Sequence, residues 1–75
     1  MNTNQFTLLQ TIHEHQPIDR ITLRYRANIS ERTLSSCLSA LQDEGYVHVA
    51  GYKGNVWLTV RGRERIDEIQ IHSHR

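Results

Sequence analysis

The chain has 75 residues, a formal net charge of +1 and one cysteine, Cys37. A chain of this length forms one domain with a small core, which leaves little room for a deep substrate cleft. One cysteine excludes an internal disulfide and favours a reducing cytoplasm. The first ten residues lack the basic start and apolar run of a signal peptide, and no stretch of about 18 apolar residues predicts a membrane span.

The near-neutral net charge is unevenly distributed. Between positions 18 and 42 four arginines stand against two carboxylates, and between positions 46 and 65 four cations stand against one carboxylate. The rest of the chain is acidic. This distribution favours a domain with one basic surface, as binding to phosphates requires.

A first helix is expected over residues 4–15, with Thr3 as its N-cap. Its apolar positions recur at helical spacing, and Leu8 lies beside the stripe. The stripe consists of Phe6, Leu9, Ile12 and His13. Pro17 ends this helix, because the residue before a proline is pushed out of the helical region.

A second, shorter helix is expected to begin after Asp19, its N-cap, and to end near Arg26. Its apolar residues are Ile21, Leu23 and Tyr25. Asn28 follows this helix, and asparagine tolerates a left-handed backbone better than most residues. The sequence therefore predicts a tight turn between the second helix and a third.

Ser30 is expected to cap a third helix that ends near Glu44, with Gly45 as its stop. Glu31 suits the positive end of the helix dipole. Apolar residues at positions i, i+3, i+4 and i+7 predict a buried stripe of Leu34, Cys37, Leu38 and Leu41. The opposite face consists of Arg32, Ser35, Ser36 and Ser39.

After Gly45 the residue types change to those of β-strands. Residues 46–49 and 55–58 form two such runs, and the five residues between them include two glycines and Lys53. This pattern predicts a two-stranded hairpin with a basic tip, which must pack on the helices because an isolated hairpin is barely stable. Trp57 is interpreted as a core residue, because it lies between two other apolar residues of the second strand.

Thr59 is the expected N-cap of a last helix that ends near Gln70. Its inner face consists of Gly62, Ile66 and Ile69. Ile71 lies on the opposite side and is a candidate contact with a second subunit. The sequence is thus divided into one domain over residues 1–70 and a disordered tail over residues 71–75.

The order helix, helix, helix, hairpin, helix resembles the winged helix-turn-helix regulators, including MarR-like and PadR-like repressors, over residues 6–69. Residues 29–34 (ISERTL) resemble the turn and start of a recognition helix. Residues 41–47 (LQDEGYV) resemble its exit into the first wing strand, and residues 57–62 (WLTVRG) resemble the second strand entering the fourth helix. The resemblance implies an α+β, mostly helical winged helix-turn-helix domain. It also implies a sequence-specific, double-stranded DNA-binding transcription regulator of bacterial type, not an enzyme.

The resemblance also implies where DNA would lie. The third helix of this fold enters the major groove, with its N-terminal half against base edges. Arg32, in the first turn, is expected to contact a guanine or a phosphate, and Thr33 beside it is expected to donate to a phosphate. The short side chains that allow close approach to DNA are Ser35, Ser36 and Ser39.

Other candidate contacts flank the third helix. Lys53 and its neighbour Tyr52 are expected to reach the minor groove or adjacent phosphates from the hairpin tip. The further phosphate candidates are Arg20, Arg24 and Arg61. Because one recognition helix covers one half-site, a homodimer is expected, formed in solution or only on DNA.

The sequence carries no pattern of an enzyme or a metal site. The five histidines lack metal-ligand spacing, and neither a nucleophile–base set nor a Gly-rich phosphate loop is present. No catalytic residue, cofactor or small-molecule substrate is therefore predicted. Two alternatives to duplex DNA remain: a protein-interaction module, and binding to RNA or single strands through Tyr25, Tyr46 and Tyr52.

Overall fold

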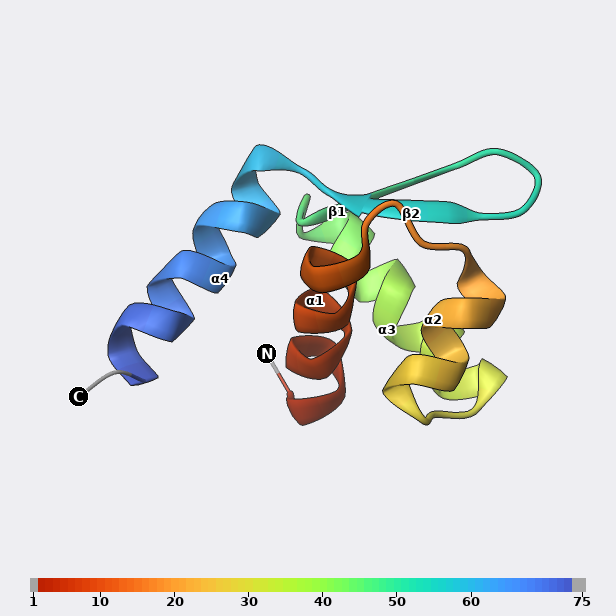
Figure 1. Cartoon of the computed structure of the whole chain (residues 1–75), viewed down its shortest axis with the longest axis horizontal. Helices are drawn as coiled ribbons and strands as arrows, with labels where there is room; N and C mark the ends of the chain where they lie inside the picture. Colours follow the sequence, from red (N-terminus) through yellow and green to blue (C-terminus); the bar gives the residue numbers. More distant parts are fainter. Residues whose placement is uncertain (1, 74–75) are drawn as a thin grey trace.

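In a computed structural model the backbone is described for residues 2–73 and the side chains for residues 2–69. The elements are α1 (Thr3–His15), α2 (Arg20–Ala27), α3 (Glu31–Asp43), β1 (Val47–Ala50), β2 (Asn55–Leu58) and α4 (Val60–Ser73). Figure 1 shows the first three helices grouped beneath an antiparallel hairpin, with α4 at the end of the hairpin opposite its turn. The predicted element order and the mostly helical fold are confirmed.

The start of α1 differs from the prediction, because Asn2 and not Thr3 is the N-cap. The Asn2 side chain accepts a hydrogen bond from the Gln5 backbone N–H at 2.9 Å. The Gln5 side chain in turn accepts from the Asn2 backbone N–H at 3.3 Å. Such a reciprocal pair satisfies two exposed donors of the first turn, an advantage that a cap at Thr3 would lack.

The two helix starts that follow are capped as predicted. The Asp19 carboxylate accepts from the Thr22 backbone N–H at 3.0 Å, and Ser30 Oγ accepts from the Thr33 backbone N–H at 3.1 Å. Between these helices Asn28 has the expected left-handed backbone, with φ of 56°. These local signals position α3 directly after α2.

The end of α3 is a tight left-handed turn. Glu44 is the C-cap, and Gly45 after it has φ of 79°. The Gly45 N–H donates to the Gln42 carbonyl and the Tyr46 N–H donates to the Leu41 carbonyl, each at 2.9 Å. This Schellman arrangement satisfies the last carbonyls of α3 and directs the chain into β1.

The core lies between the inner faces of the helices and one face of the hairpin. Its fully buried side chains include three of the four residues of the predicted α3 stripe and residues from every other element except β1, whose Val47 is 4% exposed. They are Leu8, Leu9, Ile12, Leu23, Leu34, Leu38, Leu41, Val56 and Ile66. In α2 only Leu23 is buried, whereas Ile21 and Tyr25 are 67% and 74% exposed. Residues two apart on a helix face different directions, so the three apolar residues of α2 do not share one face.

Trp57 is not a core residue, so that prediction was wrong. Neighbouring residues of a strand point to opposite faces, and Val56 and Leu58 occupy the buried face. Trp57 is half-buried on the other face, where its ring centroid lies 4.8 Å from that of His48, its cross-strand partner.

A segment that the sequence did not predict pairs with the hairpin. Ile18 exchanges two backbone hydrogen bonds with Val56, of 3.1 and 2.8 Å. The Gln16 side chain accepts from the Leu58 backbone N–H at 2.9 Å. β2 is therefore bonded on one edge to β1 and on the other to the segment that precedes α2, which adds the support that an isolated hairpin lacks.

α4 is capped by Thr59 as predicted, because Thr59 Oγ1 accepts from the Gly62 N–H at 3.1 Å. The same hydroxyl donates to the Gly45 carbonyl, which ties the start of α4 to the end of α3. α4 continues to Ser73, beyond the predicted end near Gln70, so residues 71–73 of the predicted tail belong to the helix. Residues 74–75 and the side chain of Ile71 lie outside the described parts. None of the helices described is long and apolar enough to cross a membrane.

Candidate nucleic-acid interface

The outer face of α3 is lined by small and polar side chains. Arg32, Ser36 and Ser39 are exposed and follow each other at i, i+4 and i+7, with Asp43 one turn further. They lie opposite the buried stripe, which packs on α1 and the rest of the core. A helix with such a face can approach another molecule closely, because only Arg32 extends far from its axis.

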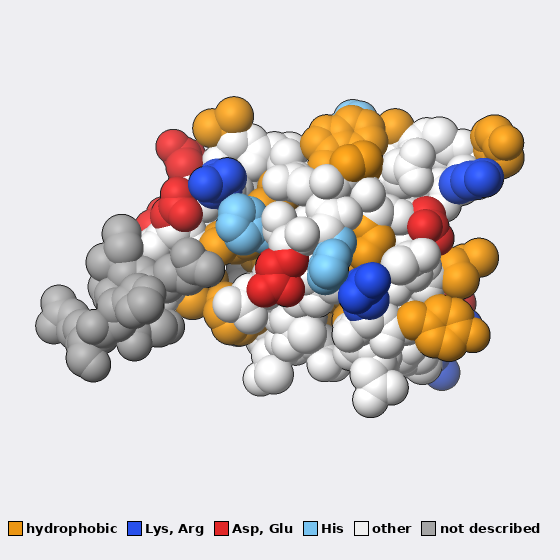
Figure 2. Space-filling model, viewed as in Figure 1, with side chains coloured by type: hydrophobic (Ala, Val, Ile, Leu, Met, Phe, Trp, Pro, Cys, Tyr) orange, Lys and Arg blue, Asp and Glu red, His pale blue; other side chains and the backbone are white. Residues whose placement is uncertain are grey.

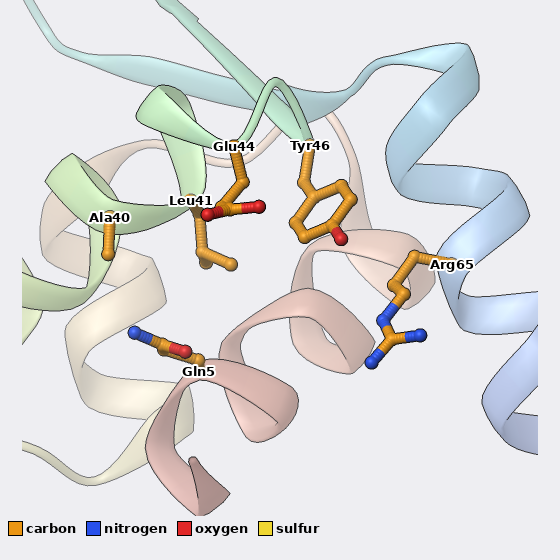
Figure 3. A pocket seen from close by; sticks show the side chains of 6 residues that line it. All are labelled: Gln5, Ala40, Leu41, Glu44, Tyr46 and Arg65. Atoms are coloured by element: carbon orange, nitrogen blue, oxygen red, sulfur yellow. The ribbon is translucent and has the colours of Figure 1, made fainter. Parts of the chain in front are cut away.

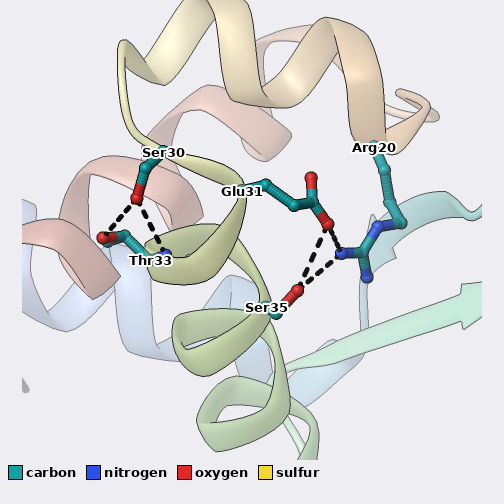
Figure 4. A network of polar contacts seen from close by, with 5 residues as sticks. All are labelled: Arg20, Ser30, Glu31, Thr33 and Ser35. Atoms are coloured by element: carbon teal, nitrogen blue, oxygen red, sulfur yellow. Dashed lines mark hydrogen bonds and ion pairs between the residues drawn. The ribbon is translucent and has the colours of Figure 1, made fainter.

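Arg20 joins the start of α2 to the start of α3 (Figure 4). Its Nη2 forms an ion pair with Glu31 Oε1 and donates to Ser35 Oγ at 2.8 Å. Ser35 also donates to the same Glu31 oxygen at 3.3 Å. The structure therefore places two predicted DNA contacts, Arg20 and Ser35, in contact with each other and with a carboxylate.

Thr33 lies on the other flank of α3. Its Oγ1 accepts from Ser30 Oγ at 3.0 Å, so the side chain is part of the helix cap (Figure 4). Arg32, Thr33 and Ser36 line a shallow hollow together with Asn2 and Asn4 at the start of α1. The structure thus brings these three predicted site residues together.

The hairpin tip forms the second part of the candidate interface. We call β1, β2 and the turn at residues 51–54 the wing. Tyr52 is 98% exposed at its tip, and Lys53 is exposed beside it. An open groove lies between the tip and the starts of α2 and α3, lined by Asp19, Arg20, Ile21, Glu31, Tyr52 and Lys53. The wing tip and the start of α3 therefore face one shared space.

Arg24 and Arg61 lie against tyrosine rings. The Arg24 guanidinium carbon is 5.5 Å from the Tyr25 ring centroid, and that of Arg61 is 5.5 Å from the Tyr46 ring centroid. Arg61 is the second residue of α4, at the base of the wing, roughly 15 Å along β2 from the tip. The structure does not bring Arg61 together with Lys53.

Several cations of the described part form no ion pair. On α4, Arg63 pairs with Asp67 at 3.7 Å and Arg65 with Glu68 at 3.4 Å. Among side chains 2–69, those without an acidic partner are Arg24, Arg26, Arg32, Lys53 and Arg61. Figure 2 shows the basic side chains of one face as separate groups, including one at the wing end of the molecule. The charge available for phosphates is therefore distributed over several elements.

Comparison with known proteins decides the family. Residues 1–50 of the chain match the model of the MarR family. The chain belongs to the MarR family. This confirms the resemblance seen in the sequence. No curated protein matches the chain.

Solved structures agree with this MarR-family assignment in their fold. MarR of Staphylococcus aureus, in complex with salicylate and kanamycin, superposes with a TM-score of 0.92 at 23% identity, over 99% of this chain and 53% of that one. BpsR of Bordetella bronchiseptica gives a TM-score of 0.90 at 17% identity, over 99% and 56% of the two chains. The PcaV transcriptional regulator of Streptomyces coelicolor gives 0.87 at 17%, over 93% and 55%. The MarR-family chain described here thus spans about half the length of these structures.

A further hollow of the MarR-family chain lies away from the outer face of α3. It is bounded by α1, α3 and α4 and lined by Gln5, Ala40, Leu41, Glu44, Tyr46 and Arg65 (Figure 3). Sequence reasoning missed it, because its lining comes from three elements whose packing no local pattern reveals.

Within the described residues no three His, Cys, Asp or Glu side chains are placed to hold a metal ion. Burial raises the pKa of the Cys37 thiol, which packs with the apolar core.

The carboxylates at the starts of α2 and α3 are held in their charged form. Hydrogen bonds from the backbone and side chain of Thr22 lower the pKa of Asp19 below 3.8. The hydrogen bond from Arg20 lowers the pKa of Glu31 below 4.5. Each depressed pKa stabilises the folded protein at pH values above the pKa that the same carboxyl group has in the unfolded chain. This stabilisation is lost as the pH falls through the pKa of the folded state.

We expect Asp19→Asn to flatten the acid end of the stability profile. Asparagine is as good an N-cap as aspartate but does not titrate, so the variant keeps the cap and loses its pH dependence. Below pH 3.8 the melting temperature of the wild type should fall more steeply than that of the variant. Thermal unfolding followed by circular dichroism, with Asp43→Asn as a control for the lost charge, measures this. Parallel acid profiles of wild type and Asp19→Asn would contradict it.

Proposed function

We propose that this MarR-family chain is a sequence-specific, double-stranded DNA-binding transcription regulator. α3 enters the major groove, and the wing lies on the adjacent groove or backbone. The observation that carries this proposal is the outer face of α3, where one arginine in the first turn is followed by three exposed serines and no bulky side chain. The reported regulation of DNA binding in BpsR also supports it.

Within this proposal the side chains have distinct roles. Arg32 reads a base edge, and Ser36 and Ser39 allow the helix to approach closely. Thr33 contacts a phosphate from the flank of α3, and Tyr52 and Lys53 contact DNA from the wing tip. Arg24 and Arg61 are further phosphate contacts. Phosphate contacts of this kind set affinity and register, whereas base contacts set specificity.

The proposal includes a homodimer on DNA, because one α3 covers a single half-site and useful specificity needs two. We place the protein in a bacterial cytoplasm, associated with the nucleoid. The bacterial relatives of known structure support this setting. We assign no catalytic activity to the protein, since its family consists of transcription regulators and its candidate interface is an open surface.

A titration of duplex DNA into isotope-labelled protein tests the proposal. Amide signals of residues 30–39 and 51–54 should shift, while those in the middle of α1 should stay in place. Affinity should fall steeply with salt, because each phosphate contact releases counterions. Duplexes selected from a random pool should bind more tightly than unselected ones. If neither segment responds at low salt, duplex binding is refuted.

One observation favours a second candidate, a protein-interaction module. Ile21 and Tyr25 lie one turn apart on the same side of α2 and are both largely exposed, so together they form a small apolar patch of the kind that protein contacts use. The same titration separates the candidates. If the protein binds DNA, duplex shifts the amide signals of α3 and the wing. If it is an interaction module, duplex leaves the amide signals of both segments unchanged.

A further inference from the structure

Arg20 lies where three elements of the candidate interface meet. The paired residues Ile18 and Val56 run antiparallel, so two residues further along position 20 comes opposite position 54 of the wing. Arg20 is also the first residue of α2, and its side chain extends toward the first turn of α3 (Figure 4). One side chain thus contacts the wing and the recognition helix together.

The stem of Arg20 packs directly on the wing backbone. A Cβ atom added to Gly54 would lie only 2.7 Å from Arg20 Cδ and 2.8 Å from Cγ. Gly54 also has φ of 68°, a conformation that favours glycine. The absence of a side chain at position 54 therefore lets the stem of Arg20 lie against the wing at van der Waals distance.

One nitrogen of the Arg20 guanidinium, Nη2, is held by α3. It contacts both the Glu31 carboxylate and the Ser35 hydroxyl, and the Arg20 side chain is 34% exposed. A phosphate that took Nη2 would have to break this ion pair, and the negative charge of Glu31 would oppose its approach to the other guanidinium nitrogens. Arg20 is therefore poorly placed for a phosphate contact, although its position on α2 predicts one.

We propose that Arg20 is a positioning residue, which fixes the distance and angle between the wing and the recognition helix. This inference rests on the proposed function, since it concerns how α3 and the wing reach DNA together. A binding constellation must be held to within about 0.5 Å by supporting side chains. Arg20 provides this support with its stem on Gly54 and its head on Glu31 and Ser35.

DNA binding by three variants separates positioning from phosphate contact. Arg20→Met keeps most of the stem and loses the head, Arg20→Lys keeps the charge and loses the planar fork, and Glu31→Gln removes a carboxylate beside the groove. Positioning predicts that all three weaken duplex binding, by about tenfold for Arg20→Met. A positioning role also predicts that the double variant Arg20→Met/Glu31→Gln loses no more affinity for duplex DNA than Arg20→Met alone. The matched control is Arg26→Met, which removes the same charge from an exposed position of α2.

A phosphate contact predicts different results for the same set. Arg20→Lys would bind nearly as well as wild type, and Glu31→Gln would bind more tightly because a repulsive charge is gone. Arg20→Met would lower the slope of log affinity against log salt by about one more than Arg26→Met does. Any of these results would overturn the positioning role.

The free protein provides a readout that does not depend on DNA. In Arg20→Met and Glu31→Gln the amide signals of residues 51–54 and 31–35 should shift together, and they should stay unchanged in Arg26→Met. Circular dichroism establishes that each variant is folded. A wild type that binds no duplex refutes the proposed function, whereas unchanged wing signals in Arg20→Met refute the positioning role alone.

Discussion

Gly62→Ala is expected to destabilise the domain by about 3 kcal/mol, a large fraction of the stability of so small a protein. A Cβ atom at this position would lie 2.0 Å from the Tyr46 carbonyl oxygen and 3.3 Å from Leu58 Cδ2. The Tyr46 carbonyl cannot withdraw freely, because it accepts a hydrogen bond from the Thr59 N–H at 3.1 Å. α4 would have to move away from the hairpin and expose part of its contact with the core.

Helix propensity acts in the opposite direction. Alanine is favoured over glycine inside a helix by about 1 kcal/mol, so an exposed glycine in α4 would gain stability from the same change. Urea unfolding followed by circular dichroism measures the net effect. Glu64→Ala, on the exposed side of α4, is the control and should change stability by at most about 0.5 kcal/mol. A Gly62→Ala variant as stable as the wild type would show that α4 does not pack on the hairpin as described.

Arg32→Ala is expected to weaken binding to a selected duplex by about 1–3 kcal/mol and to relax preference at one base pair. Arg32 is exposed in the first turn of α3 and has no acidic partner among the described side chains, so its guanidinium is free to reach a base edge. Binding constants for the selected duplex and for each single-base variant of it measure both effects. An equal loss on every sequence would contradict base reading by Arg32.

Lys53→Ala provides the comparison for Arg32. At the exposed wing tip a lysine contacts phosphates as a point charge, so its loss should weaken all duplexes alike and lower the salt slope by about one. Arg26→Ala should have a smaller effect than either. If Lys53→Ala altered sequence preference, the wing tip would have to read bases.

The sequence predicted best what nearby residues decide. Ser30 accepts from an amide three residues away, and the stripe of α3 repeats within single turns, so both follow from local chemistry alone. The N-cap of α1 was missed by one residue, since Asn2 and Thr3 are both good caps and only the bond to Gln5 decides between them. Trp57 was misplaced because alternation tells which residues share a face, not which face is buried.

The candidate site was predicted unevenly for the same reason. The exposure of Arg32, Ser36 and Ser39 follows from their spacing opposite the apolar stripe. The pairing of Arg20 with Glu31, eleven positions along the chain, depends on how α2 packs on α3, which no pattern within either helix specifies. The hollow lined by Arg65 likewise arises only where α4 meets α1 and α3.

By itself, then, the sequence determined the order of the elements, most of their ends and the outer face of α3, because caps, turns and helical periodicity act within about four residues. Only the tertiary structure decided that Ile18 pairs with β2, that Gly62 lies against the Tyr46 carbonyl, and that Arg20 forms an ion pair with Glu31. These contacts join residues far apart in the chain. They form only when burial of the shared core brings the helices and the hairpin together.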